Sequence, residues 1–283
     1  MVSPNTKIPT TKATKVMYGL LQKCRKHKLS IECQLDMFDK TILPILLYGS
    51  KIWGFENIDI IERVHLRFCK LILHLKQSTP NFMVYGELGR YPISVIMKVR
   101  MTRFWCGILN GKEFKLSYLL YFANYGYENK WLSFIQNLLN SRGKSNIWLD
   151  QNSYSTVWLS SSVEQKLKDQ FFQEWSENMN STSKGLCYWI FKTELKIEKY
   201  ISIWPYNYMF NFYKFRCGGH RLPVETGRWH NVSRADRSCR LCDSADIGDA
   251  FHYIMSCNYL KQERENIYRV IAVIMSIPWN LRS

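Results

Sequence analysis

The chain has 283 residues, 46% of them hydrophobic and 15% aromatic, so it can build one large domain or two modest ones and is not a disordered chain. Its formal net charge of +16 favours a polyanionic partner. Nucleic acid is the first candidate, and an anionic membrane surface has less support. No run of about 18 apolar residues occurs, which argues against a membrane-spanning helix.

The first part of the chain is predicted to be helical after a short lead. Residues 1–11, which contain Ser, Pro and Thr, are expected to be flexible. Apolar residues recur with helical spacing from about Lys12 to Lys28, and Ser30 is placed to cap a second helix. The apolar stretch Ile42–Gly54 predicts a buried helix or two short pieces.

Helical patterns continue beyond this stretch and then become less regular. An amphipathic helix is expected from about Ile58 to Leu75. A helical pair is expected over 82–110, split near Gly89–Pro92. Shorter helices are expected at Leu116–Ala123 and Trp131–Asn140.

The second half of the chain has a helix-start signal and a polar break. Ser161 and Glu164 have the spacing of a capping box, which predicts that a helix begins there. The polar stretch Ser176–Lys184 is the best candidate for a domain boundary. An aromatic-rich helix is expected over 186–203, whereas Tyr206–Arg216 is compatible with helix or strand. The fold class is therefore expected to be mainly α.

Three cysteines and a histidine near the C-terminus have metal-ligand spacing. Cys239, Cys242, His252 and Cys257 follow the pattern Cys-x2-Cys-x9-His-x4-Cys. Three thiolates and one imidazole suit a tetrahedral zinc site, and four protein ligands make it a closed, structural one. A turn-rich loop separates the two halves of the motif, and 250–260 has the pattern of a short helix.

Two other states of these cysteines remain open. They can be unliganded thiols, or less plausibly part of a disulfide framework, since the chain has nine cysteines and no visible signal peptide. Reduced thiols without an export signal lead us to expect the nucleus or the cytoplasm.

Basic residues are concentrated in two segments. Residues 1–30 hold seven Lys and Arg and no acid, and 214–240 hold seven against two acids. Either segment can be a solvated surface, but the second leads directly into the cysteine motif and favours phosphate contacts. The candidates for these contacts are Arg216, Arg221, Arg228, Arg237 and Arg240. Trp229 and Tyr253 are candidates for base stacking or for the core.

The sequence contains no recognisable catalytic constellation. It has no phosphate-binding loop, no dinucleotide fingerprint and no nucleophile elbow. His65 and His74 lack the spacing of a zinc-protease pair and are expected to be surface or core residues. Asp36 and Asp39 have neighbours typical of surface acids, and no adjacent Asp-Asp pair is present. We therefore expect that the chain is not an enzyme.

Several phrases resemble one known family. They are Tyr48–Gly54, Ile61–Cys69 followed by Ser78–Pro80, Tyr85–Pro92, Lys214–Arg228 and the Cys/Cys/His/Cys motif with Gly248–His252 before its end. Together they resemble the region that follows the catalytic core of LINE-type (non-LTR) retrotransposon reverse transcriptases.

This resemblance spans about residues 12–270 and implies a domain organisation. Residues 12–110 would be a helical thumb-like region, 111–180 a helical connector, and 181–283 a basic segment with a zinc knuckle at 239–257. It also implies zinc binding by the motif and contact of the basic stretch with RNA or DNA. The fingers and palm, with their catalytic aspartates, are not part of this sequence, so DNA synthesis is not implied.

Three functions are compatible with these observations. The first is a non-catalytic segment that binds RNA or DNA, with no membrane contact and with its polymerase core absent from this chain. The second is a helical protein–protein adaptor whose zinc site is purely structural. The third is a decayed fragment without function, whose exposed apolar surface would make it insoluble alone.

Overall fold

The computed structural model describes residues 4–56, 58–111, 115–125, 127, 129–182, 188–189, 192–204 and 206–276, with side chains described for all of these except 4–8, 206–207 and 270–276. Within these ranges the protein is mainly helical, as expected, and contains no strand. The only β-type pairing there is an isolated antiparallel bridge between Ser238 and Ile247. No helix in the described ranges combines the length and apolarity needed to cross a membrane.

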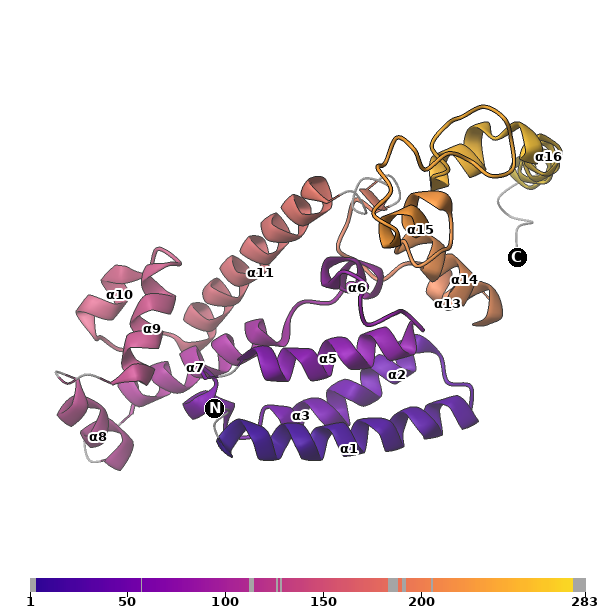
Figure 1. Cartoon of the computed structure of the whole chain (residues 1–283). Helices are drawn as coiled ribbons and strands as arrows, with labels where there is room; N and C mark the ends of the chain where they lie inside the picture. Colours follow the sequence, from indigo (N-terminus) through magenta and orange to yellow (C-terminus); the bar gives the residue numbers. More distant parts are fainter. Residues whose placement is uncertain are drawn as a thin grey trace.

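The first helices of the chain lie close together (Figure 1). They are α1 (Pro4–Lys26), α2 (Ile31–Met37), the π-helix η1 (Phe38–Ile42), α3 (Leu43–Leu46), α4 (Ser50–Trp53) and α5 (Ile58–Ile72). Ser30 caps α2 as expected, because its Oγ accepts a hydrogen bond from the N–H of Cys33 at 3.2 Å. The stretch 42–54 breaks into short pieces at Gly49, whose φ of 68° is left-handed.

The expectation of a flexible N-terminal lead was wrong. Residues 4–11 belong to α1 and are not a flexible lead, while 1–3 lie outside the described residues.

The middle of the chain forms a second group of helices. They are α6 (Asn81–Leu88), α7 (Ile93–Leu109), α8 (Leu116–Asn124), α9 (Lys130–Asn140), α10 (Ser145–Asp150) and α11 (Thr156–Ser181). The long helix α11 packs along α7. Its N-cap is Ser155, whose Oγ accepts from the N–H of Trp158 at 3.4 Å, so the capping box at Ser161 and Glu164 was a wrong prediction. Glu164 lies inside α11 and pairs with Lys168 at 2.7 Å.

The C-terminal part has shorter elements. They are α13 (Tyr200–Ile203), α14 (Tyr206–Arg216), α15 (Pro223–Trp229), the π-helix η2 (His252–Ser256), the 3-10 helix η3 (Asn258–Leu260) and α16 (Lys261–Ser276). The ambiguous segment Tyr206–Arg216 is thus a helix. The helix expected over 186–203 is not continuous, because 192–199 contain bends and turns and 186–187 and 190–191 lie outside the described residues.

Two hydrophobic cores hold these helices together. The first joins α1–α6 to Trp175, Tyr188 and Tyr213 from later in the chain. The second lies among α7–α11 and includes Trp105, which is fully buried. Trp105 and Trp175 are therefore core residues, and Trp53 packs against the first core. The first core contains residues from both sides of 180, and the second contains residues from both sides of 110.

A buried charge network links α6 to the C-terminal part. The Glu87 carboxylate is fully buried and accepts from Arg216 Nε at 3.0 Å and from the hydroxyl of Tyr200. A second Arg216 nitrogen lies 3.4 Å from Glu198, which also accepts from buried Lys192 at 2.6 Å. Each charge thus has a partner, which a buried ion needs to remain charged.

Close backbone approach supports this network. Gly89 has a φ of 59°, and a Cβ at this position would lie 2.4 Å from the backbone nitrogen of Ile197. A Cβ on Gly86 would lie 2.5 Å from the hydroxyl of Tyr188. The two glycines therefore allow the segment 192–199 and Tyr188 to sit directly against α6.

Replacing Glu87 by Gln should lower the free energy of unfolding by about 3 kcal/mol, because it leaves a buried guanidinium without its main counter-charge. The measurement is urea unfolding followed by circular dichroism. Asp36→Asn is the control: it removes a carboxylate that pairs with Lys40 at 2.6 Å on the surface and should leave stability unchanged. Equal stability of both variants would contradict the assigned role of Glu87.

Candidate metal centre

The first half of the centre is a tight backbone turn. The N–H of Cys239 donates to the carbonyl of Asp246, and the N–H of Gly248 donates to that of Arg237, both at 2.8 Å. At the tip, the N–H of Leu241 points to the sulfur of Cys239 at 3.4 Å. This turn places the thiols of Cys239 and Cys242 on the same side.

The second half is a short helical turn. The carboxylate of Asp249 accepts from the N–H of His252, the first residue of η2, at 2.9 Å. The N–H of Cys257 returns to the carbonyl of His252 at 2.7 Å and ends it. The carbonyl of Cys257 accepts from Arg264 at 3.0 Å, which fixes the turn against α16. His252 and Cys257 consequently face the two cysteines of the first half.

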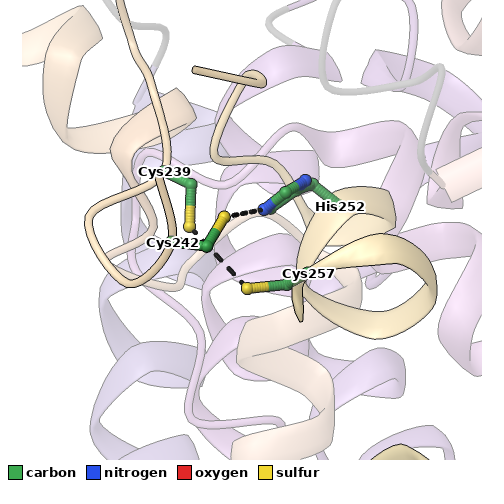
Figure 2. A group of neighbouring side chains, drawn as sticks. All are labelled: Cys239, Cys242, His252 and Cys257. Atoms are coloured by element: carbon green, nitrogen blue, oxygen red, sulfur yellow. Dashed lines mark hydrogen bonds between the residues drawn. The ribbon is translucent and has the colours of Figure 1, made fainter. Parts of the chain in front are cut away.

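Figure 2 shows the four side chains converging on one point. Their ligand atoms all lie within 4.8 Å of one another. The sulfurs of Cys239 and Cys257 are 4.0 Å apart, and the sulfur of Cys242 is 3.3 Å from Nε2 of His252. A tetrahedral ion with bonds of about 2.3 Å to sulfur sets ligand atoms about 3.8 Å apart, so the spacing fits such an ion.

The surroundings of His252 orient it for metal binding. Its Nδ1 lies 3.4 Å from a carboxylate oxygen of Asp246 and 3.3 Å from the hydroxyl of Ser256. A proton on Nδ1 directed to Asp246 leaves Nε2, the atom that faces Cys242, with its lone pair free. The sequence pattern indicated the four ligands but gave no sign of these two supporting groups.

The local environment favours the thiolate at Cys239. Burial raises the pKa of this thiol, but hydrogen bonds from Tyr253 and from the backbone N–H groups of Leu241 and Cys242 outweigh burial and lower its pKa to about 6. For Cys257, burial dominates and raises the pKa. Burial lowers the pKa of His252, but the neighbouring sulfurs of Cys242 and Cys239 reverse this and raise it, so a proton and a metal ion compete for the site.

The structure separates the five candidate arginines into two groups. Arg216 is buried in the charge network with Glu87 and lies over the ring of Tyr200, so it is not available to a phosphate. This expectation needs correction: the positive charge balances a buried carboxylate.

Arg237 also has a structural role, because its guanidinium donates to the carbonyls of Val224 and Val232 at 2.7–3.0 Å and braces the turn before Cys239. Arg221 and Arg240 are exposed. Arg228 is partly exposed and lies 3.5 Å from Glu225.

The candidate aromatic residues also differ in position. Trp229 is 55% exposed, with the ammonium of Lys76 5.0 Å from its ring centre. Tyr253 is half-buried and its hydroxyl interacts with the sulfur of Cys239, which indicates a supporting role in the centre. Two further aromatic residues, which no pattern in the sequence singled out, are exposed: Phe251 at 58%, directly before His252, and Tyr259 at 65%, after Cys257.

The remaining polar candidates have structural partners. His65 is fully buried, contacts Glu62 at 2.8 Å and accepts from Arg90 Nε at 3.1 Å. Asp39 is no isolated surface acid, since Arg90 donates to both of its oxygens at 3.0 and 2.5 Å. His74 is exposed, with its ring 3.8 Å from that of Phe210.

The four side chains thus form a cluster that could hold a metal ion. No protein-family model, curated protein or solved structure matches the chain. The type of metal ion is therefore inferred from the chemistry and the geometry of the four side chains.

Purified protein prepared without chelator should contain one tightly held metal ion per chain, measured by elemental analysis. Cys239→Ser should abolish this, because three ligands remain and the turn loses its closure. Cys33→Ser, which changes an exposed cysteine outside the cluster, should retain the metal. Full metal content in the Cys239 variant would refute the ligand set.

Metal retention should also fall with pH. The pKa of Cys239 is depressed in the folded protein, so its stabilising effect is complete above the unfolded pKa of about 8.5 and disappears as the pH falls through about 6. Protons also compete with the metal for all three thiolates. Titration from pH 8 to 5 with a chromogenic chelator should therefore show release centred near or below pH 6, and pH-independent retention would contradict it.

Proposed function

We propose that this chain is a non-catalytic nucleic-acid-binding segment, similar to the C-terminal region of a LINE-type retrotransposon reverse transcriptase, with a structural zinc ion in its Cys/Cys/His/Cys centre. Zinc is the preferred ion because three thiolates and one imidazole form a soft, tetrahedral and closed donor set. The cluster of four converging ligands, with exposed cations beside it, is the observation that carries the proposal.

The surface around the centre supports nucleic-acid binding. Arg240 lies between Cys239 and Cys242 in the chain and is exposed, as is Arg221. Arg234 is 44% exposed and lies 3.8 Å from a carboxylate oxygen of Asp249. Phe251, directly before His252, and Tyr259, two residues after Cys257, have exposed rings. Cations that bind phosphates and rings that stack on bases together suit RNA or DNA, and stacking favours unpaired strands.

Two of the retrotransposon-like phrases, which lie far apart in the sequence, contact each other in the structure, and this supports the proposal that they belong to one region. Glu87 belongs to the phrase Tyr85–Pro92 and Arg216 to the phrase Lys214–Arg228, and the two side chains pair in the interior. Phrases far apart in the sequence are thus parts of one packed unit. The polymerase core would come from sequence outside this chain.

One observation favours the adaptor function as a second candidate. Helix α8 is apolar but exposes most of its surface, with Leu116, Leu119 and Leu120 at 53–70% exposure. Exposed apolar surface of this kind can dock a protein partner. It does not explain the arginines at the centre, and nucleic-acid binding therefore remains the primary proposal.

Filter binding of labelled single-stranded RNA over a salt series tests the primary proposal. The affinity should fall steeply with salt, because each neutralised phosphate releases counterions. The double variant Arg221→Ala/Arg240→Ala should reduce the logarithmic slope by roughly 1.4, at about 0.7 for each lost contact to a single strand.

Lys166→Ala is the control, because it removes an exposed cation on α11, far along the chain from the centre. It should leave the slope unchanged. Absence of RNA and DNA binding at low salt would refute the primary proposal and leave the adaptor function.

A further inference from the structure

A hollow of about 520 Å³ lies between the turn before α4 and the surface of α7. Its volume falls in the range of small-molecule sites. It is lined by Pro44, Leu47, Tyr48, Gly49, Ser50, Lys51, Arg100, Arg103 and Phe104. These elements are separate from the metal centre, so the hollow requires an explanation of its own.

The lining is strongly cationic. Lys51, Arg100 and Arg103 are all exposed, and no Asp or Glu lines the hollow. Arg100 and Arg103 are three residues apart and so lie on one face of α7. The described contacts of these cations are to a carbonyl or a ring: Arg100 donates to the carbonyl of Leu47 at 3.4 Å, and Lys51 Nζ lies 4.6 Å from the ring centre of Phe104.

A neighbouring hollow of about 480 Å³ provides a comparison. It also uses Arg100 and Arg103, but its additional cations Arg90 and Lys168 are paired. Arg90 pairs with Asp39, and Lys168 pairs with Glu164 at 2.7 Å. The hollow at Lys51 has no such compensation, which makes it the stronger anion site of the two.

Ser50 supplies a second, independent indication of a ligand. The residue is 1% exposed and belongs to the lining of the hollow, and its hydroxyl is one of two buried side-chain polar atoms without a hydrogen-bond partner in the described part of the chain. A buried hydroxyl without a partner is unfavourable unless a ligand completes it. The neighbouring residue Tyr48 is 80% exposed, so its ring is free to stack.

We propose that this hollow binds a nucleoside phosphate, either a free nucleotide or the terminal nucleotide of a strand. Arg100, Arg103 and Lys51 hold the phosphate, since guanidinium groups match its oxygens. The ring of Tyr48 stacks on the base, and the Ser50 hydroxyl gains its missing partner. This site does not depend on the function proposed for the metal centre.

Calorimetric titration of the full chain with adenosine monophosphate, and separately with inorganic phosphate, tests the proposal. The nucleotide should bind at least about fivefold more tightly than phosphate, the low end of what base stacking contributes. Tyr48→Ala should remove this difference and leave phosphate binding unchanged. Equal affinity for both ligands in the unmodified protein would overturn the nucleotide assignment.

Variants of the cationic side chains test the phosphate contacts. Arg103→Ala and, independently, Lys51→Ala should each weaken nucleotide binding by about fivefold or more, the loss of one charge-assisted hydrogen bond. Both positions are exposed, so the fold should persist, as thermal melting would verify. Lys166→Ala should bind as tightly as the unmodified chain. An effect of the Lys166 change equal to that of Arg103 would contradict a specific site.

Ser50→Ala separates ligand binding from packing. It removes an unpaired hydroxyl, so the melting temperature should not fall, whereas nucleotide affinity should drop about threefold. An unchanged affinity would exclude Ser50 from the site. A 5′-phosphorylated oligonucleotide that competes with the nucleotide would identify a strand end as the source.

Cys239→Ser should retain nucleotide binding, because the hollow and the metal centre are separate sites. Loss of nucleotide binding together with the metal would contradict an independent hollow.

Discussion

The ion pair between Glu87 and Arg216 is the interaction on which the arrangement of the chain depends. Its two partners are 129 residues apart, and both are almost completely removed from water. A buried carboxylate and guanidinium are tolerated only in each other's presence, so the pair specifies which part of the C-terminal region docks on α6. Tyr200 and Glu198 occupy the remaining hydrogen-bonding positions around it. The C-terminal part also contacts the N-terminal helices elsewhere, where α13 packs against α2 and the hydroxyl of Ser202 donates to Glu32.

The basic residues between 214 and 240 have two different roles: some satisfy groups inside the protein and others face solvent. Arg216 and Arg237 are both in the segment that leads into the cysteines, and both have their charge satisfied inside the protein. Arg221 and Arg240, a few residues away, face solvent. The net charge of the chain therefore overstates the charge available to a partner near the centre. The net charge also does not indicate where the cations of α7 lie. These cations line a hollow that has no carboxylate in its lining.

Sequence patterns predicted those features that depend on residues close together in the chain. Ser30 caps α2 because one hydroxyl and one N–H three residues apart decide that geometry. The four residues of the Cys/His cluster were predicted together because only two residues separate Cys239 from Cys242 and only four separate His252 from Cys257. Ser161 failed as a cap because Ser155, six residues earlier, offered a hydroxyl at the true beginning of α11. The supporting groups Asp246 and Ser256 were not visible, since acids and serines are common in turns and nothing in their spacing marks them as partners of His252.

The sequence by itself determined the helical class, the four residues of the Cys/His cluster and the excess of positive charge, because periodicity, spacing and composition carry these properties directly. Only the tertiary structure decided which charges are internal and which are exposed. That distinction arises from pairing across long sequence separations, as between Glu87 and Arg216 or Asp39 and Arg90. It also decided the ambiguous segment Tyr206–Arg216, which is a helix with Tyr213 in the first core. The burial of a residue depends on which residues pack against it, and these cannot be identified from the sequence alone.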